Sequence, residues 1–162
     1  MKTLINGRWT DRKDEKQSND GSFKRKDTEF RNWITPDGSP GETGVGGFKA
    51  ESGRYHLYVS LACPWAHRTL IFRKLKNLEP HIGVSIVHPI MLENGWEFRT
   101  DFSQCTGDQI LGKNSSFEVY LTADKNITSR ASVPVLWDVK QATIVSNESS
   151  EIIRMFNSAF EK

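Results

Sequence analysis

The clearest pattern in the chain begins at residue 54, where apolar and polar residues start to alternate. Apolar side chains occupy every second position of 55–61, which predicts a β-strand. A proline follows at position 64, where the first turn of a helix tolerates it, and apolar residues then recur at helical spacing. These residues are Ala66, Leu70, Ile71, Leu75 and Leu78. A second alternating run at 82–86 completes a strand–helix–strand crossover, which predicts the core of an α/β domain.

The C-terminal third of the chain continues this domain. Two apolar runs, 133–138 and 143–145, are separated by polar residues and predict a hairpin. A last helix is expected to start near 146–148, where a capping side chain and an acidic first turn suit the helix dipole. Its predicted buried stripe consists of Ile152, Ile153, Phe156 and Phe160.

Two segments have weaker patterns. Residues 1–50 mix polar residues with isolated aromatics, which predicts an irregular N-terminal arm before a domain at 51–162. The aromatics expected to hold this arm against the domain are Trp9, Phe23, Phe30 and Trp33. Residues 88–132 are polar and too long for an ordinary connection, so they are either functional, as a lid over a site, or locally helical.

Composition narrows the classes of partner. The chain has 162 residues and a net charge of only +2. Its overall electrostatic field is too weakly positive to attract a polyanion, so we expect no nucleic-acid partner. No apolar stretch approaches the ~20 residues of a membrane-spanning helix, and no secretory signal is present at the N-terminus. Two cysteines do not make a disulfide framework, so we expect a cytoplasmic protein in a reducing compartment, without a membrane partner.

Cys63 is the strongest candidate for chemistry. It stands at the junction of the predicted strand and helix, where backbone N–H groups of the first turn favour a thiolate, the nucleophilic form. His67 and Arg68, one turn onward, are candidates to add positive charge there, and His67 is equally well explained as a packed or exposed helix residue. Position 66 is Ala rather than a second cysteine, and Cys105 is distant, so an external thiol has to resolve any adduct on Cys63.

Two other interpretations of these residues are conceivable, and one of them remains open. Cys63 could be a small buried apolar side chain, as many cysteines are. Metal binding is not expected, because the four histidines and two cysteines show no paired ligand spacing.

Several stretches together resemble one family. They are RYHLYVSLACPWAHRTLIFR (54–73), VHPIMLENGWEF (87–98), SVPVLWD (132–138) and IVSNESSEIIRMFN (144–157). In this order they resemble the glutathionyl-hydroquinone reductases, the Xi class of glutathione transferases. The resemblance implies a thioredoxin-like fold with a mixed four-stranded sheet flanked by helices. It also implies that Cys63 attacks the sulfur of a glutathionyl-hydroquinone, and that a second glutathione, as co-substrate, then regenerates the thiolate.

The same resemblance implies the glutathione-binding residues. Trp96 would line the ligand, Arg130 would neutralise a carboxylate, and Val133, before a cis proline, would offer backbone hydrogen bonds. Glu148 and Ser149 would hold the γ-glutamyl end, because a carboxylate pairs with an ammonium and a helix N-terminus receives a carboxylate. Taken alone, each residue also has an ordinary interpretation: Glu148 as a helix cap, Trp96 as a loop aromatic and Arg130 as a solvated charge.

The chain also departs from this family. Its members carry an all-helical C-terminal domain with quinone-pocket tyrosines and much of the subunit contact, and this sequence ends before it. We therefore expect weak glutathione binding with little hydroquinone specificity, and a homodimer is a possible assembly. Two rival functions remain: an omega-type thiol transferase or dehydroascorbate reductase, and a non-catalytic interaction module on the same fold.

Overall fold

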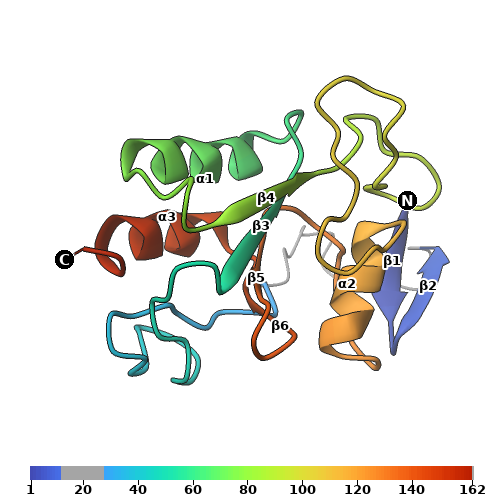
Figure 1. The fold of residues 1–162 in the computed structure, drawn as a ribbon. Helices are drawn as coiled ribbons and strands as arrows, with labels where there is room; N and C mark the ends of the chain where they lie inside the picture. The colour runs from blue at the N-terminus through green and yellow to red at the C-terminus, as the bar shows by residue number, and fades with distance from the viewer. Residues whose placement is uncertain (12–27, 162) are drawn as a thin grey trace, which may run out of the picture.

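A mixed four-stranded sheet lies at the centre of the computed structural model, which describes residues 1–11 and 28–161 (Figure 1). The strand order is β4-β3-β5-β6, with β4 parallel to β3 and the other neighbours antiparallel. The predicted crossover and hairpin are therefore confirmed. The strands are β3 (Tyr55–Val59), β4 (Gly83–Ile86), β5 (Val135–Asp138) and β6 (Thr143–Ser146).

Helices cover both faces of this sheet. Figure 1 shows α1 (Pro64–Leu75) and α3 (Ser149–Ser158) side by side on one face, and α2 (Ser116–Ala123) on the other. Each face has its own apolar cluster, so the sheet separates two cores. Within the described residues, no helix is long and apolar enough to cross a membrane.

Strand β3 is buried on both faces. Leu57 and Val59 face the cluster under α1 and α3, whereas Tyr58 belongs to the cluster under α2. The alternation predicted a strand correctly, but its polar side is covered as well. The strand ends at Val59 rather than at Leu61, which is 43% exposed, because Ser60 turns the chain by accepting the backbone N–H of Ala62.

The predicted apolar stripe of α1 is only partly right. Ala66 is fully buried, but Ile71 and Leu75 are 43% and 68% exposed. Thr69 takes a buried position instead, and its hydroxyl donates to the carbonyl of Ala66 at 2.6 Å. A polar residue is tolerated there because its hydrogen bond is made within the helix.

The first eleven residues form a hairpin that the sequence analysis did not predict. Strands β1 (Lys2–Ile5) and β2 (Arg8–Asp11) pair antiparallel, with Asn6 and Gly7 at positive φ in the turn. An Asn-Gly pair is a strong local signal for such a turn. Trp9 stacks on Phe117 of α2 at 4.6 Å, which docks the hairpin beside that helix.

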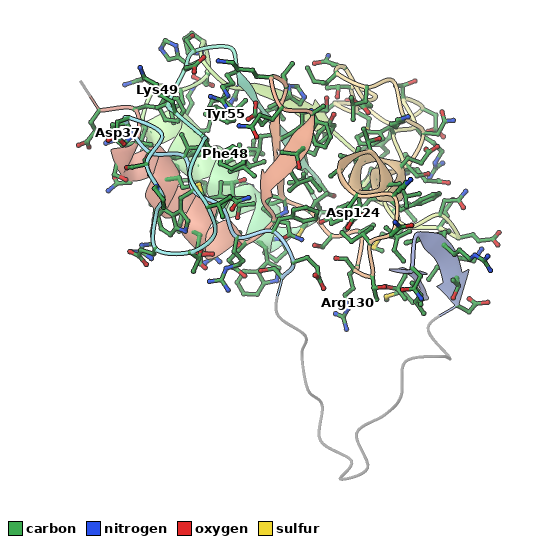
Figure 2. The ribbon with its side chains drawn as sticks, turned by 90° about the horizontal axis from the view of Figure 1, so that it is seen from below. Asp37, Phe48, Lys49, Tyr55, Asp124 and Arg130 are labelled. Atoms are coloured by element: carbon green, nitrogen blue, oxygen red, sulfur yellow. The ribbon has the colours of Figure 1, made fainter. Side chains whose placement is uncertain are left out.

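The rest of the described arm, 28–50, packs along α3 and the edge of the sheet. Trp33 is buried in the cluster under α1 and α3, as expected of an anchoring aromatic, and Phe48, which was not among the expected anchors, is buried there too. Figure 2 shows Phe48 and Lys49 close to Tyr55, whose hydroxyl donates to the carbonyl of Lys49 at 2.7 Å. Phe23, another predicted anchor, lies outside the described residues.

The long stretch before β5 contains helix α2 and an ordered loop. Ser115 and Glu118 form a capping box at the start of α2, so the stretch is locally helical. In the preceding loop, the Asp108 carboxylate accepts the Tyr58 hydroxyl at 2.8 Å and three backbone N–H groups from 110–113. This carboxylate ties the loop to the central strand, and a lid function for the loop stays a prediction.

Candidate functional site

Cys63 is the N-cap residue of α1. Three residues separate it from the end of β3, and Pro64 opens the first turn of the helix, where a missing N–H costs no hydrogen bond. The side chain is half-buried and its sulfur lies 3.6 Å from the carbonyl oxygen of Val133. The sulfur therefore stands at the positive end of the α1 dipole and against the chain that leads into β5.

The residue pair Val133-Pro134 has a cis peptide bond, as predicted. Val133 is 5% exposed, and its carbonyl accepts the Cys63 thiol. Its own backbone N–H has no acceptor among the described residues. Val133 thus presents main-chain groups beside the sulfur.

The second cysteine is in a different setting. Cys105 is a free, half-buried cysteine, and its thiol donates to the carbonyl of Val87 at 3.5 Å. Burial, together with the nearby Asp101 carboxylate, raises the pKa of the Cys105 thiol. A raised pKa disfavours the thiolate, so Cys105 is poorly suited to resolve an adduct on Cys63.

The start of α3 carries two of the predicted residues. Glu148 is the N-cap, and one of its carboxylate oxygens accepts the backbone N–H and the hydroxyl of Ser150 at 3.2 and 2.9 Å. Its other oxygen accepts the hydroxyl of Thr28 at 3.4 Å. Ser149, the first helical residue, is 5% exposed. Glu148 is therefore a helix cap, and it also faces the N-terminal arm.

These elements enclose a cleft of about 390 Å³. Three of the expected glutathione contacts, Val133, Glu148 and Ser149, line it, whereas Cys63 is not part of the lining. The contacts of these three residues with glutathione stay predictions. The charged side chains in the lining are Arg31, Arg68 and Glu148, with Arg31 paired to Glu151. Cationic groups and a helix N-terminus suit carboxylates, and the single carboxylate of the lining suits an ammonium group.

Trp96 and Arg130 do not line this cleft. Trp96 is half-buried and packs against both apolar clusters, while its carbonyl accepts the backbone N–H of Ser116. Arg130 is exposed, and Figure 2 shows it on the loop before β5. The binding roles of these two residues stay predictions.

Several lining residues were missed by sequence reasoning. Trp65 belongs to the first turn of α1, and its proximity to Cys63 in the sequence was the available signal. Arg68 was expected to add positive charge near Cys63 but not to line a cleft. Thr28 and Arg31 come from the arm, and no local pattern marks polar residues of an irregular segment as lining a cleft. Groups of three or more His, Cys, Asp or Glu able to hold a metal ion are absent from the part of the chain that the structure describes.

Comparison with known proteins places the chain. Residues 62–159, more than half of the sequence, match the family described as "Glutathione S-transferase, N-terminal domain". The chain belongs to this family. It is 59% identical over 161 residues to "Glutathionyl-hydroquinone reductase YqjG" of Escherichia coli (strain K12), a match that covers 99% of this chain and 49% of that protein.

Two solved structures agree with this assignment. The glutathione-bound structure of YqjG from Escherichia coli K-12 is similar with a TM-score of 0.85 and 56% identity, covering 98% of this chain and 46% of that one. The Xi class glutathione transferase from Natrialba magadii gives a TM-score of 0.83 and 46% identity, covering 99% and 45%. The predicted Xi-class resemblance and thioredoxin-like fold are therefore confirmed. The chain spans about half the length of the curated relatives it matches.

Proposed function

We propose that this chain carries the glutathione site and the nucleophile of a glutathione-dependent reductase acting on glutathionyl-hydroquinones. Cys63 carries this proposal, because its sulfur lies at the start of α1 and 3.6 Å from the carbonyl of Val133. Val133, together with residues at the start of α3, lines the cleft. The relative YqjG is named a glutathionyl-hydroquinone reductase and has been solved with glutathione bound.

The chemistry has two steps. The Cys63 thiolate attacks the glutathione sulfur of the substrate, a sulfur–sulfur bond forms, and the bond from that sulfur to the ring carbon breaks. The released electron pair and a proton from solvent form a C–H bond, so the ring is reduced to hydroquinone while the two sulfurs are oxidised to a mixed disulfide. A second glutathione thiolate then attacks the bound glutathione sulfur, and Cys63 leaves as the thiolate.

The ligand follows the line from Cys63 to α3 in this proposal. When Cys63 is ionised it no longer donates to the Val133 carbonyl, which is then free, with the Val133 N–H, to bond the cysteinyl backbone of glutathione. The γ-glutamyl ammonium pairs with Glu148, and its carboxylate binds at Ser149. The expected roles of Trp96 beside the ligand and of Arg130 in neutralising a carboxylate belong to this proposal, although neither residue lines the cleft.

This function suits a cytoplasm rich in reduced glutathione, because a single active cysteine needs an external thiol in every turnover. The proposal also includes the hydroquinone substrate and assembly into a homodimer.

Intact-protein mass spectrometry tests the nucleophile. After incubation with oxidised glutathione, we expect one glutathionyl adduct on the wild-type chain and on Cys105→Ser, and none on Cys63→Ser. An adduct that survives in Cys63→Ser and disappears in Cys105→Ser would overturn the assignment of the nucleophile.

Turnover with a glutathionyl-hydroquinone, dehydroascorbate and a mixed disulfide tests the substrate. Because we expect little hydroquinone specificity from this chain, it should turn over a glutathionyl-hydroquinone only slowly, and fast turnover of that substrate would contradict this expectation. Preference for dehydroascorbate would support the omega-type alternative, and adduct formation without turnover of any acceptor would support a binding module.

A further inference from the structure

Arg68 links the helix that carries Cys63 to the first residue of α3. Its Nε and one Nη donate to the Ser149 hydroxyl oxygen at 3.0 and 2.7 Å. Its guanidinium also lies 5.1 Å from the centre of the Trp65 ring, which restricts the side chain from a second direction. The three residues all line the cleft, so the link lies at the ligand site.

The number of hydrogen bonds that the Ser149 hydroxyl can accept and donate shows what its contact with Arg68 does. A serine hydroxyl accepts two hydrogen bonds and donates one. Both acceptor positions of Ser149 are taken by Arg68, so the hydroxyl can only donate its proton elsewhere. Ser149 is 5% exposed, and neither this hydroxyl proton nor its backbone N–H has an acceptor among the described residues. A first-turn N–H has no partner within its own helix, so both donors are available to a group bound in the cleft.

An anion is the partner that these donors fit. The Ser149 N–H belongs to the first turn of α3, where the helix dipole favours negative charge, and the guanidinium polarises the hydroxyl as a donor. Glu148, the neighbouring residue in the lining, supplies a negative charge that suits a cationic group next to this anion. An anion beside an ammonium on one carbon is the amino-acid end of glutathione, whereas its glycyl end carries a carboxylate alone.

We propose that Arg68 is a positioning residue for recognition of the γ-glutamyl carboxylate: it holds the Ser149 hydroxyl as a donor aimed at that group. This inference rests on the proposed function, because it assumes that the cleft binds glutathione. It adds a residue of α1 to the recognition of a group at α3, so the helix that presents Cys63 also orders the far end of the site.

Three non-reactive ligands separate recognition from a merely structural role. S-methylglutathione presents both carboxylates, its glycyl ethyl ester masks the glycyl one, and S-methylated 4-aminobutyryl-Cys-Gly keeps the amine but lacks the γ-glutamyl carboxylate. Binding to each is measured by calorimetry with the wild-type chain, Arg68→Met and Arg68→Lys. Arg154→Met is the matched control, because Arg154 also stacks on a tryptophan, Trp33, but is exposed and pairs with Glu42 outside the cleft.

We expect Arg68→Met to weaken binding of S-methylglutathione and of its glycyl ester by about 10- to 100-fold, the value of a charge-assisted hydrogen bond. Binding of the 4-aminobutyryl peptide should change little, since the group that Ser149 recognises is absent. Arg68→Lys keeps the charge without the two-pronged donor, so it should bind S-methylglutathione more weakly than the wild type and again leave the 4-aminobutyryl peptide little affected. Arg154→Met should leave all three affinities unchanged.

Other outcomes overturn the inference. An equal loss for all three ligands in Arg68→Met and Arg68→Lys would make Arg68 a structural link only, and unchanged affinities would remove it from the site. Both results would leave the proposed function standing, as long as the wild-type chain binds S-methylglutathione. A wild-type chain that binds none of the ligands would overturn the proposed function and this inference together.

Discussion

The pH dependence of stability provides a sharp test of the packing around β3. His56 lies on this central strand and is 4% exposed, and its Nε2 lies 2.7 Å from the hydroxyl oxygen of Ser85 on β4. Burial lowers the pKa of His56 from 6.5 to about 4, against the opposing effect of the Asp108 carboxylate and with a smaller lowering by Arg73. The folded protein therefore holds this imidazole neutral where the unfolded chain would protonate it.

The sign and size of the effect follow from this pKa. Between pH 6.5 and about 4 the unfolded state binds more protons at His56 than the folded state does, so stability falls as the pH falls through this window. The contribution is fully present above pH 6.5 and is lost once the folded state also takes up the proton. A lowering of this size corresponds to at most about 3 kcal/mol of unfolding free energy, of which about 2.5 kcal/mol would be lost near pH 4.5.

Urea unfolding near pH 7 and pH 4.5 measures this loss. We expect His56→Gln, which keeps a polar partner for Ser85, to show a smaller drop in unfolding free energy than the wild type over this interval. His81→Gln is the control, since His81 is exposed and its only described side-chain partner is Ser52, 2.8 Å away. If the wild type and His56→Gln lose the same free energy on acidification, the burial argument for this histidine is wrong.

Two further substitutions test how the domain and its arm are held together. Arg54 is 7% exposed and donates to the Asp138 carboxylate at 2.7 and 3.1 Å. Asp138→Ala should lower the unfolding free energy by about 3–5 kcal/mol, because it removes the main buried counter-charge of Arg54. A loss below about 1 kcal/mol in urea unfolding would contradict a buried, intact ion pair. Trp33→Ala should lower the unfolding free energy by about 3–5 kcal/mol, because it removes a buried ring that anchors the arm. The same substitution should speed proteolysis within residues 28–50. Cleavage at the wild-type rate would show that the arm is held by other contacts.

Much of the fold could be predicted because its signals are local. The β3–α1–β4 crossover follows from the change of apolar period on either side of Pro64, and the β5–β6 hairpin from two short apolar runs. Each of these patterns lies within a few residues of the element that it predicts. The β1–β2 hairpin was also locally encoded by its Asn-Gly turn and was overlooked within a polar segment.

The exposure of α1 could not be predicted from its own sequence. Ile71 and Leu75 recur at helical spacing with Ala66, yet only Ala66 is buried. Spacing identifies the residues that share a helix face, but the angle at which the helix lies on the sheet decides which part of that face is covered. The apolar cluster between the sheet and α2 could not be predicted for a similar reason. The alternation along β3 does not show that a helix distant in the sequence covers its polar side.

The sequence by itself determined the crossover, the hairpin and the last helix of the core, the position of Cys63 at a helix start and the family to which the chain belongs. Tertiary structure alone decided which polar groups meet in and around the cleft. Cys63 approaches Val133 across 70 positions, Arg68 reaches Ser149 across 81, and Arg31 pairs with Glu151 across 120. Local patterns encode the conformation of a segment. Contacts between residues far apart in the sequence form only when their segments pack against the same sheet, so a local pattern does not reveal them.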